Sequence, residues 1–136
     1  MRSPTAIMAL AIIAAPGAAL AFEAGELVGK WGLAAYFEDK DAGQTEAAAH
    51  AQCHAPYVIA RGRTGGVMLH LPVERKTTEM QVKASLGTVY IGPPGEAGGK
   101  ADRQVLRFDG RTLVLKWLDP EVAHRYGIMV FVRCGK

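Results

Sequence analysis

The chain lacks a hydrophobic run long enough to cross a membrane. Its most apolar segment, residues 6–15, is followed by a proline and a glycine, whereas a spanning helix needs about 20 apolar residues. An arginine before this segment and the small-x-small sequence Ala19–Ala21 after it complete the pattern of a secretory signal peptide. We therefore expect residues 1–21 to be cleaved and residues 22–136 to be periplasmic or secreted. An uncleaved anchor is the alternative, and no cysteine follows the segment to carry a lipid anchor.

Catalytic signatures are also missing. The one serine after residue 21, Ser85, lies in Ala-Ser-Leu-Gly and not in the G-x-S-x-G turn that presents a nucleophile. Carboxylates are scattered along the chain without a distinctive pair, and no glycine-rich phosphate-binding pattern occurs. The sequence therefore predicts a protein that is not an enzyme and has no cofactor.

Charges of either sign do not gather in long blocks. The chain has 16 basic and 13 acidic residues, a net charge of +3. Nucleic-acid binding favours a basic patch with a recognisable motif, and neither is evident. The C-terminal part is richer in basic residues, which predicts either a basic face that attracts acidic partners or charges dispersed on the outward sides of strands.

The two cysteines are the first positive signal. Cys53 and Cys134 form an even set in a chain expected to be exported, and such a set indicates a disulfide. A bridge over this span stabilises a fold by roughly 4 kcal/mol on the chain-entropy model. Free buried thiols are the alternative.

Two histidines accompany the first cysteine. His50 and His54 are four residues apart, so on a helix they share a face that could capture copper or zinc. Because Cys53 is needed for the disulfide and no second ligand cluster is evident, we expect solvated histidines and no metal site. A structural or metal-binding role in the cell envelope is kept as an alternative function.

Short alternating runs dominate the sequence after residue 56 and predict β strands. An alanine-rich segment, residues 42–52, predicts one short helix near the N-terminus. About eight short strands with turn signals between them predict a mainly β fold, a single small antiparallel β-barrel, with a sandwich as the alternative. The strands are expected at residues 27–37, 57–60, 67–71, 79–85, 88–91, 105–108, 111–118 and 126–134.

The strongest turn signal is Asp109-Gly110 between two β-rich runs. This dipeptide predicts a two-residue type I′ turn, which would place Leu106 opposite Leu113. The residues then expected on the core face of this hairpin are Leu106, Phe108, Leu113, Leu115 and Trp117.

One set of residues resembles a family of inhibitors. A small exported β-barrel with one disulfide resembles the bacterial periplasmic inhibitors of lysozyme and, more distantly, the barrel-type metalloprotease inhibitors. The C-type lysozyme inhibitors have a serine-containing motif followed by Gly-x-x-Tyr, which Ser85, Gly87 and Tyr90 match. Leu86 replaces the polar residue expected before the glycine, and the family's second motif, Lys-Gly after an aromatic residue, is not evident. The resemblance implies that the protein blocks a lysozyme or another cell-wall hydrolase.

A proline-containing loop extends this hypothesis. Residues 92–99, Gly-Pro-Pro-Gly-Glu-Ala-Gly-Gly, are suited to neither a helix nor a central strand. A loop stiffened by proline loses less entropy when it docks into a cleft, although a solvated connection without a partner is the alternative. The residues predicted to contact a protein partner are Ser85, Gly87, Tyr90, Pro93 and Pro94.

A second resemblance comes from Gly29-Lys30-Trp31, which looks like the Gly-x-Trp opening of lipocalin-like barrels. In those barrels a late arginine packs over the tryptophan, which implies that Arg133 packs on Trp31 at the barrel base. The resemblance implies a carrier of a small apolar ligand. An eight-stranded barrel is either filled or holds one small ligand, so the interior decides. The side chains expected to fill it, and so to leave no carrier, are Trp31, Phe108, Trp117 and Phe131.

Overall fold

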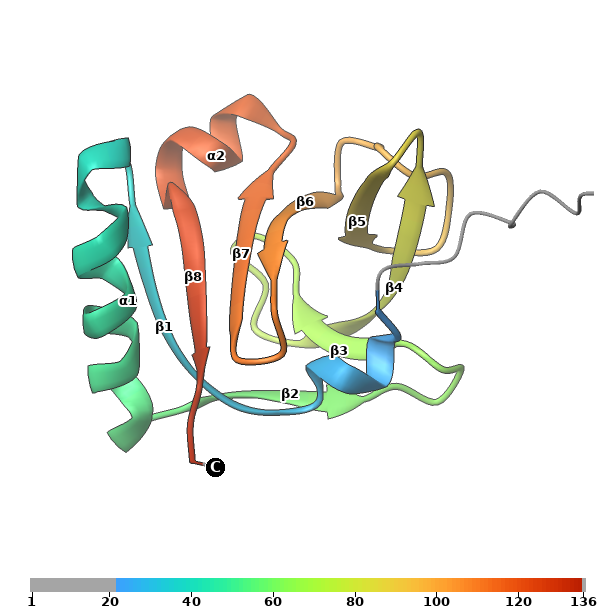
Figure 1. Cartoon of the computed structure of the whole chain (residues 1–136). Helices are drawn as coiled ribbons and strands as arrows, with labels where there is room; N and C mark the ends of the chain where they lie inside the picture. Colours follow the sequence, from blue (N-terminus) through green and yellow to red (C-terminus); the bar gives the residue numbers. More distant parts are fainter. Residues whose placement is uncertain (1–21, 136) are drawn as a thin grey trace, which may run out of the picture.

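A computed structural model describes residues 22–135, which form a closed barrel of antiparallel strands (Figure 1). Each strand pairs with the next one along the chain, and the last strand pairs with the first. The predicted antiparallel barrel is confirmed, and the predicted signal peptide lies outside the described residues. The strands are β1 (Gly29–Tyr36), β2 (Tyr57–Arg61), β3 (Val67–His70), β4 (Thr77–Ser85), β5 (Thr88–Gly92), β6 (Arg103–Phe108), β7 (Thr112–Trp117) and β8 (Ile128–Arg133).

The helix α1 (Ala42–Ala51) lies against the outer face of β1 and β8 (Figure 1). Its fully buried Ala49 packs with the outward side chains of Val114 and Val130. The helix can approach β1 this closely because residue 32 is a glycine, and a Cβ atom at Gly32 would overlap the carbonyl oxygen of Ala49. A second, smaller core therefore lies outside the barrel, beneath α1.

The disulfide joins the end of this helical segment to the end of the barrel. Cys53 lies in the short 3-10 helix η3 (Gln52–His54), and Cys134 directly follows β8. Their Cα atoms are 5.6 Å apart and the residues are separated by 81 positions in sequence, which confirms the predicted pairing. The bridge therefore fastens α1 to the strand that closes the barrel.

A second helix, α2 (Pro120–Tyr126), connects β7 to β8 and was not predicted. Asp119 caps it by accepting a hydrogen bond from the backbone N–H of Glu121 (3.0 Å), and a proline occupies the first turn. The helix ends at Gly127, whose φ is 68°. The cap and the proline were visible in the sequence as Asp-Pro-Glu, but the segment is too short to show a helical hydrophobic period.

The β6–β7 hairpin differs from the predicted one. Phe108 pairs with Leu113, so four residues separate this pair where two were predicted between Phe108 and Arg111, and the predicted register is wrong. The carboxylate of Asp109 accepts hydrogen bonds from the backbone N–H groups of Thr112 (2.7 Å) and Arg111 (2.9 Å). These bonds are the main reason why the pKa of Asp109 falls to about 2. An aspartate side chain can close a turn in this way, and here only Gly110 has a positive φ (88°), whereas a type I′ turn needs positive φ at both central residues.

A β-bulge in β6 accounts for the second difference in this hairpin. The pairing shifts between Val105 and Arg107, and the extra residue turns Leu106 outward, where 44 % of it is exposed. The predicted place of Leu106 in the core is therefore wrong. The other residues predicted for the core face do contribute to the barrel interior, namely Phe108, Leu113, Leu115 and Trp117.

One end of the barrel, called the base below, is closed by residues 22–27, the first that the structure describes. The 3-10 helix η1 (Ala24–Leu27) lies there, in place of the first residue of the predicted strand. Trp31 is fully buried above it, and the Trp31 indole Nε1 donates a hydrogen bond to the carbonyl of Leu27 (2.9 Å). Phe22 stacks on Phe108 nearby, with 4.5 Å between the ring centroids.

Arg133 completes the base. The guanidinium carbon of Arg133 lies 4.2 Å from the ring centroid of Trp31. Nε donates to the carbonyl of Gly110 (2.9 Å), Nη1 to that of Val28 (3.0 Å) and Nη2 to that of Glu26 (2.5 Å). The last strand thus holds the segment before β1 (residues 22–28, called the entry segment) and the β6–β7 turn together around the tryptophan.

The disulfide is a covalent link that can be removed without replacing side chains of the hydrophobic core. We expect the double substitution Cys53→Ala and Cys134→Ala to lower the free energy of unfolding by about 3 kcal/mol, because the reduced chain gains conformational entropy when it unfolds. Urea unfolding of the oxidised protein measures this change. A reducing agent should bring the wild type to the level of the variant and leave the variant unchanged. Equal unfolding midpoints for the oxidised wild type and the variant would contradict this prediction.

Candidate functional site

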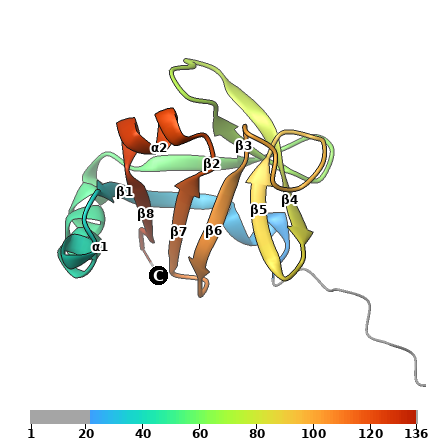
Figure 2. The ribbon, with the colours of Figure 1, turned by 90° about the horizontal axis from the view of Figure 1, so that it is seen from above.

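The structure separates the five residues predicted to form one contact surface. Ser85 and Gly87 lie at the turn between β4 and β5, at the base end of the barrel. Pro93 and Pro94 follow β5 and lie at the opposite end, called the mouth below (Figure 2). Tyr90 lies between them in β5, next to Gly98. A partner that contacts all five residues would therefore have to extend along the whole length of β5.

The β4–β5 turn has the two-residue type I′ form that the sequence predicted for the β6–β7 hairpin. Ser85 pairs with Thr88, and the two residues between them, Leu86 and Gly87, have φ values of 51° and 80°. Positive φ at both central positions is the type I′ geometry. Leu86 is fully exposed at its tip.

The β5–β6 loop is shaped by a buried ion pair. The Lys83 Nζ lies 2.7 Å from Asp102 Oδ1, and the two side chains are 11 % and 2 % exposed. Lys83 also donates to the carbonyls of Pro93 (2.9 Å) and Glu96 (3.2 Å). The other carboxylate oxygen of Asp102 accepts the backbone N–H groups of residues 98 and 99 at 2.8 and 3.2 Å. The loop therefore has a fixed shape, which the sequence could not reveal because the pair is 19 residues apart.

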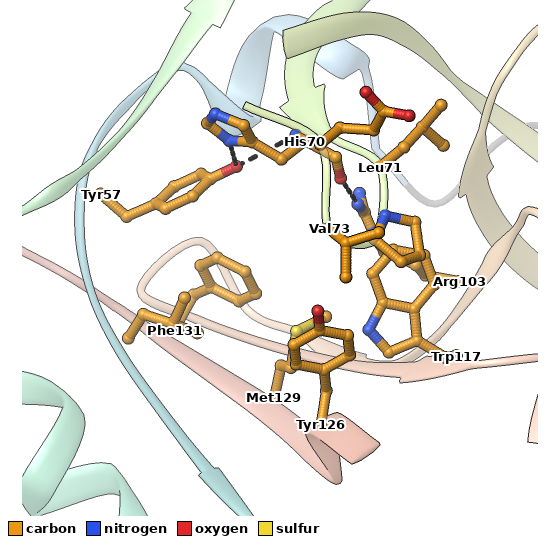
Figure 3. Close-up of a pocket in the computed structure, with 12 residues that line it drawn as sticks. Tyr57, His70, Leu71, Val73, Arg103, Trp117, Tyr126, Met129 and Phe131 are labelled. Atoms are coloured by element: carbon orange, nitrogen blue, oxygen red, sulfur yellow. Dashed lines mark hydrogen bonds between the residues drawn. The ribbon is translucent and has the colours of Figure 1, made fainter. Parts of the chain in front are cut away.

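The barrel interior is filled at the base and hollow at the mouth. A cavity of about 310 Å³ opens among strands of the barrel, the β3–β4 loop and α2 (Figure 3). Trp31 and Phe108 pack at the base, as described above, whereas Trp117 and Phe131 form part of the cavity wall. The apolar and aromatic part of this wall also includes Leu33, Leu71, Tyr57, Tyr126 and Met129.

The aromatic side chains of the cavity wall contact one another. Tyr57 meets Phe131 edge-on at 5.8 Å between ring centroids, and Trp117 lies 6.4 Å from Tyr126. The hydroxyl of Tyr57 is 2.9 Å from Nδ1 of His70 and accepts the backbone N–H of the same histidine (3.2 Å). The cavity is therefore apolar with a defined polar edge.

A second arginine–tryptophan stack lies at the mouth. Arg103 begins β6 and pairs with Trp117 at the end of β7. Both residues are buried, at 4 % and 5 % exposure, and the guanidinium carbon is 4.1 Å from the indole centroid. The guanidinium Nη2 donates a hydrogen bond to the carbonyl of His70 (Figure 3). Burial lowers the pKa of Arg103 to about 10, so the side chain is still charged at neutral pH.

This stack leaves two hydrogen-bond donors unused. Nε of Arg103 and Nε1 of Trp117 are buried and have no partner within residues 22–135. In the same part of the chain, no acidic side chain forms an ion pair with Arg103. Buried donors and charges are nearly always paired in proteins. The sequence analysis missed both roles, because the predicted strand began only at residue 105, which left out Arg103, and because Trp117 was expected to fill the interior.

The predicted absence of a metal site stays a prediction. Cys53 is in the disulfide, His50 is exposed on α1, and Nδ1 of His54 lies 2.8 Å from the carbonyl of Ala51. Across the described residues, no group of three or more His, Cys, Asp or Glu side chains is arranged to hold a metal ion. The part of the chain that the structure describes also has no helix of the length and hydropathy that a membrane crossing requires.

Comparison with known proteins gives no relative for this chain, because no family model, curated protein or solved structure matches it. The function is therefore argued from the geometry of the mouth and its rim.

Proposed function

We propose that this protein binds a small, mostly apolar molecule in the mouth of its barrel. The cavity of about 310 Å³ carries this proposal. Small-molecule sites are typically concave, lined mainly by apolar and aromatic side chains, and equipped with a few converging polar groups. Here the aromatic wall and the polar groups of His70, Arg103 and Trp117 meet that description.

The dimensions limit what can bind. Water occupies about 30 Å³ per molecule in the liquid, so the cavity suits a compound of roughly ten to twenty non-hydrogen atoms. The base is packed with side chains, so the ligand would enter and leave at the mouth. No nucleophile or metal ligand set has been identified at this site, which favours a binding or carrier role over catalysis. Together with the predicted signal peptide, this supports an exported binding protein.

A neutral apolar dye tests the proposal. We expect phenylnaphthylamine to bind at a single saturable site with increased fluorescence. The substitution Met129→Trp should weaken this binding about tenfold or more, because a larger ring occupies part of the cavity. Val58 is 55 % exposed on β2, so Val58→Trp is the matched control and should bind the dye as the wild type does. Undiminished binding by Met129→Trp, with its fold intact by circular dichroism, would contradict the proposal.

Inhibition of a cell-wall hydrolase is a second candidate, which the resemblance to lysozyme inhibitors implies. The observation that favours it is the β5–β6 loop, whose shape is set by the Lys83–Asp102 pair before any partner docks. Ser85 and Gly87 lie at the other end of the barrel, so the proposed inhibitory contact consists of Pro93 and Pro94, with Tyr90 beside the loop at Gly98. The mechanism is steric, with the stiff loop occupying the substrate cleft.

This candidate predicts inhibition in a turbidity assay with lysozymes of several classes. Replacing Pro93 and Pro94 by glycine should weaken inhibition, because the free loop then loses more entropy on docking. Replacing Ser85 by alanine is the control and should leave inhibition unchanged. If a micromolar excess of the protein inhibits no lysozyme class, the inhibitor hypothesis is rejected.

A further inference from the structure

We infer that the molecule held at the mouth is a small aromatic monocarboxylate, and that its carboxylate binds Arg103 and Trp117 while its ring packs against the aromatic wall. This inference rests on the proposed function, which it extends from an apolar molecule to one chemical class.

The first step concerns charge. Arg103 is 4 % exposed and carries a positive charge that no acidic side chain within residues 22–135 neutralises. Glu74, on the rim of the cavity, is exposed. A buried charge is costly unless a counter-charge and hydrogen bonds accompany it. One carboxylate supplies a single negative charge, which matches the single guanidinium.

The second step concerns hydrogen bonds. A carboxylate has two oxygens and several acceptor sites, and the mouth offers two buried donors that have no partner in the described part of the chain, Nε of Arg103 and Nε1 of Trp117. The indole nitrogen of Trp117 is on the side of the ring that faces Tyr126 (Figure 3). Hydrogen bonds between a guanidinium and a carboxylate are among the strongest in proteins.

The stack at the base shows what a completed arrangement looks like. Three nitrogens of Arg133 donate to backbone carbonyls, and Nε1 of Trp31 donates to a fourth. At the mouth the protein supplies one carbonyl, that of His70, to the same pair of residue types. The missing acceptors are the ones that a bound carboxylate would provide.

Access to these donors requires a small movement, because both nitrogens are shielded from solvent. The rim provides a segment suited to it. Val73 lines the cavity, is 76 % exposed and has a φ of 57°. This conformation is strained for a β-branched residue, and relief of the strain would favour a change of shape of the rim loop when a ligand enters.

The ring of the ligand is specified by the wall. Tyr57, Phe131 and Tyr126 present ring edges and faces to the cavity, and aromatic rings pack favourably in offset or edge-on contacts. A planar aromatic body attached to the carboxylate therefore fits the remaining volume.

Naphthaleneacetate and naphthaleneacetamide test the inference, because they have the same size and differ in charge. In isothermal titration calorimetry, we expect the wild type to bind the carboxylate about tenfold more tightly than the amide. Arg103→Met should abolish this preference, and Trp117→Phe should weaken binding of the carboxylate more than binding of the amide. Arg107 lies on the same strand but is exposed outside the barrel, so Arg107→Met is the matched control and should keep the preference.

The outcomes separate the inference from the proposed function. Equal affinity of the wild type for acid and amide, or a preference that persists in a folded Arg103→Met variant, overturns the inference and leaves dye binding in the mouth untouched. Failure of both compounds while phenylnaphthylamine binds also overturns it alone, whereas failure of all three overturns the proposed function as well. If Arg103→Met does not fold, Arg103→Lys takes its place. That variant keeps the charge without the guanidinium Nε, so its preference should fall between the wild-type value and none, and an unchanged preference would count against the inference.

Discussion

The stack of Arg133 on Trp31 is the interaction on which the organisation of the barrel depends. It brings the last strand, the entry segment and the β6–β7 turn together around one buried ring, and each hydrogen bond of the guanidinium goes to a backbone carbonyl. Because the donors of the partly buried Arg133 and of the buried Trp31 are paired with carbonyls, the base is closed without leaving these groups unsatisfied. The disulfide between Cys53 and Cys134 fastens the same strand to the helix outside the barrel. Because side chains fill the base, the empty part of the barrel interior lies at the mouth.

The mouth uses the same pair of residue types with a different outcome. Arg103 stacks on Trp117 at nearly the same distance, but one carbonyl accepts from it, and two donors of the pair have no partner in residues 22–135. Leaving such donors unpaired costs about 1–3 kcal/mol for each group. A ligand that binds the folded state offsets a cost of this kind by mass action. The proposed ligand would offset this cost at the mouth, whereas the donors of Arg133 and Trp31 at the base are paired within the protein.

The sequence was sufficient for the architecture but not for the site. Alternating hydrophobic residues predicted the barrel, and an even cysteine count predicted the bridge, because both signals are local or compositional. The register of the β6–β7 hairpin could not be predicted in the same way. The carboxylate of Asp109 closes the turn, and the bulge at Leu106 shifts the pairing of β6 with β7. Neither effect follows from the pattern of hydrophobic residues. Arg103 and the Lys83–Asp102 pair gain their roles from contacts between distant strands. The signal peptide and the inhibitor resemblance stay predictions.

Binding of a carboxylate at Trp117 in the mouth, and not at Trp31 in the base, is measured most directly by nuclear magnetic resonance of the two indole N–H groups. The chain has two tryptophans, so a nitrogen–proton correlation spectrum shows one signal for Trp31, hydrogen-bonded to Leu27, and one for Trp117, which has no partner among the residues that the structure describes. The Trp117→Phe variant assigns them. Titration with naphthaleneacetate should move the Trp117 signal strongly and leave the Trp31 signal in place. A saturated complex in which the Trp117 signal has not moved, or in which the Trp31 signal moves instead, would contradict the account.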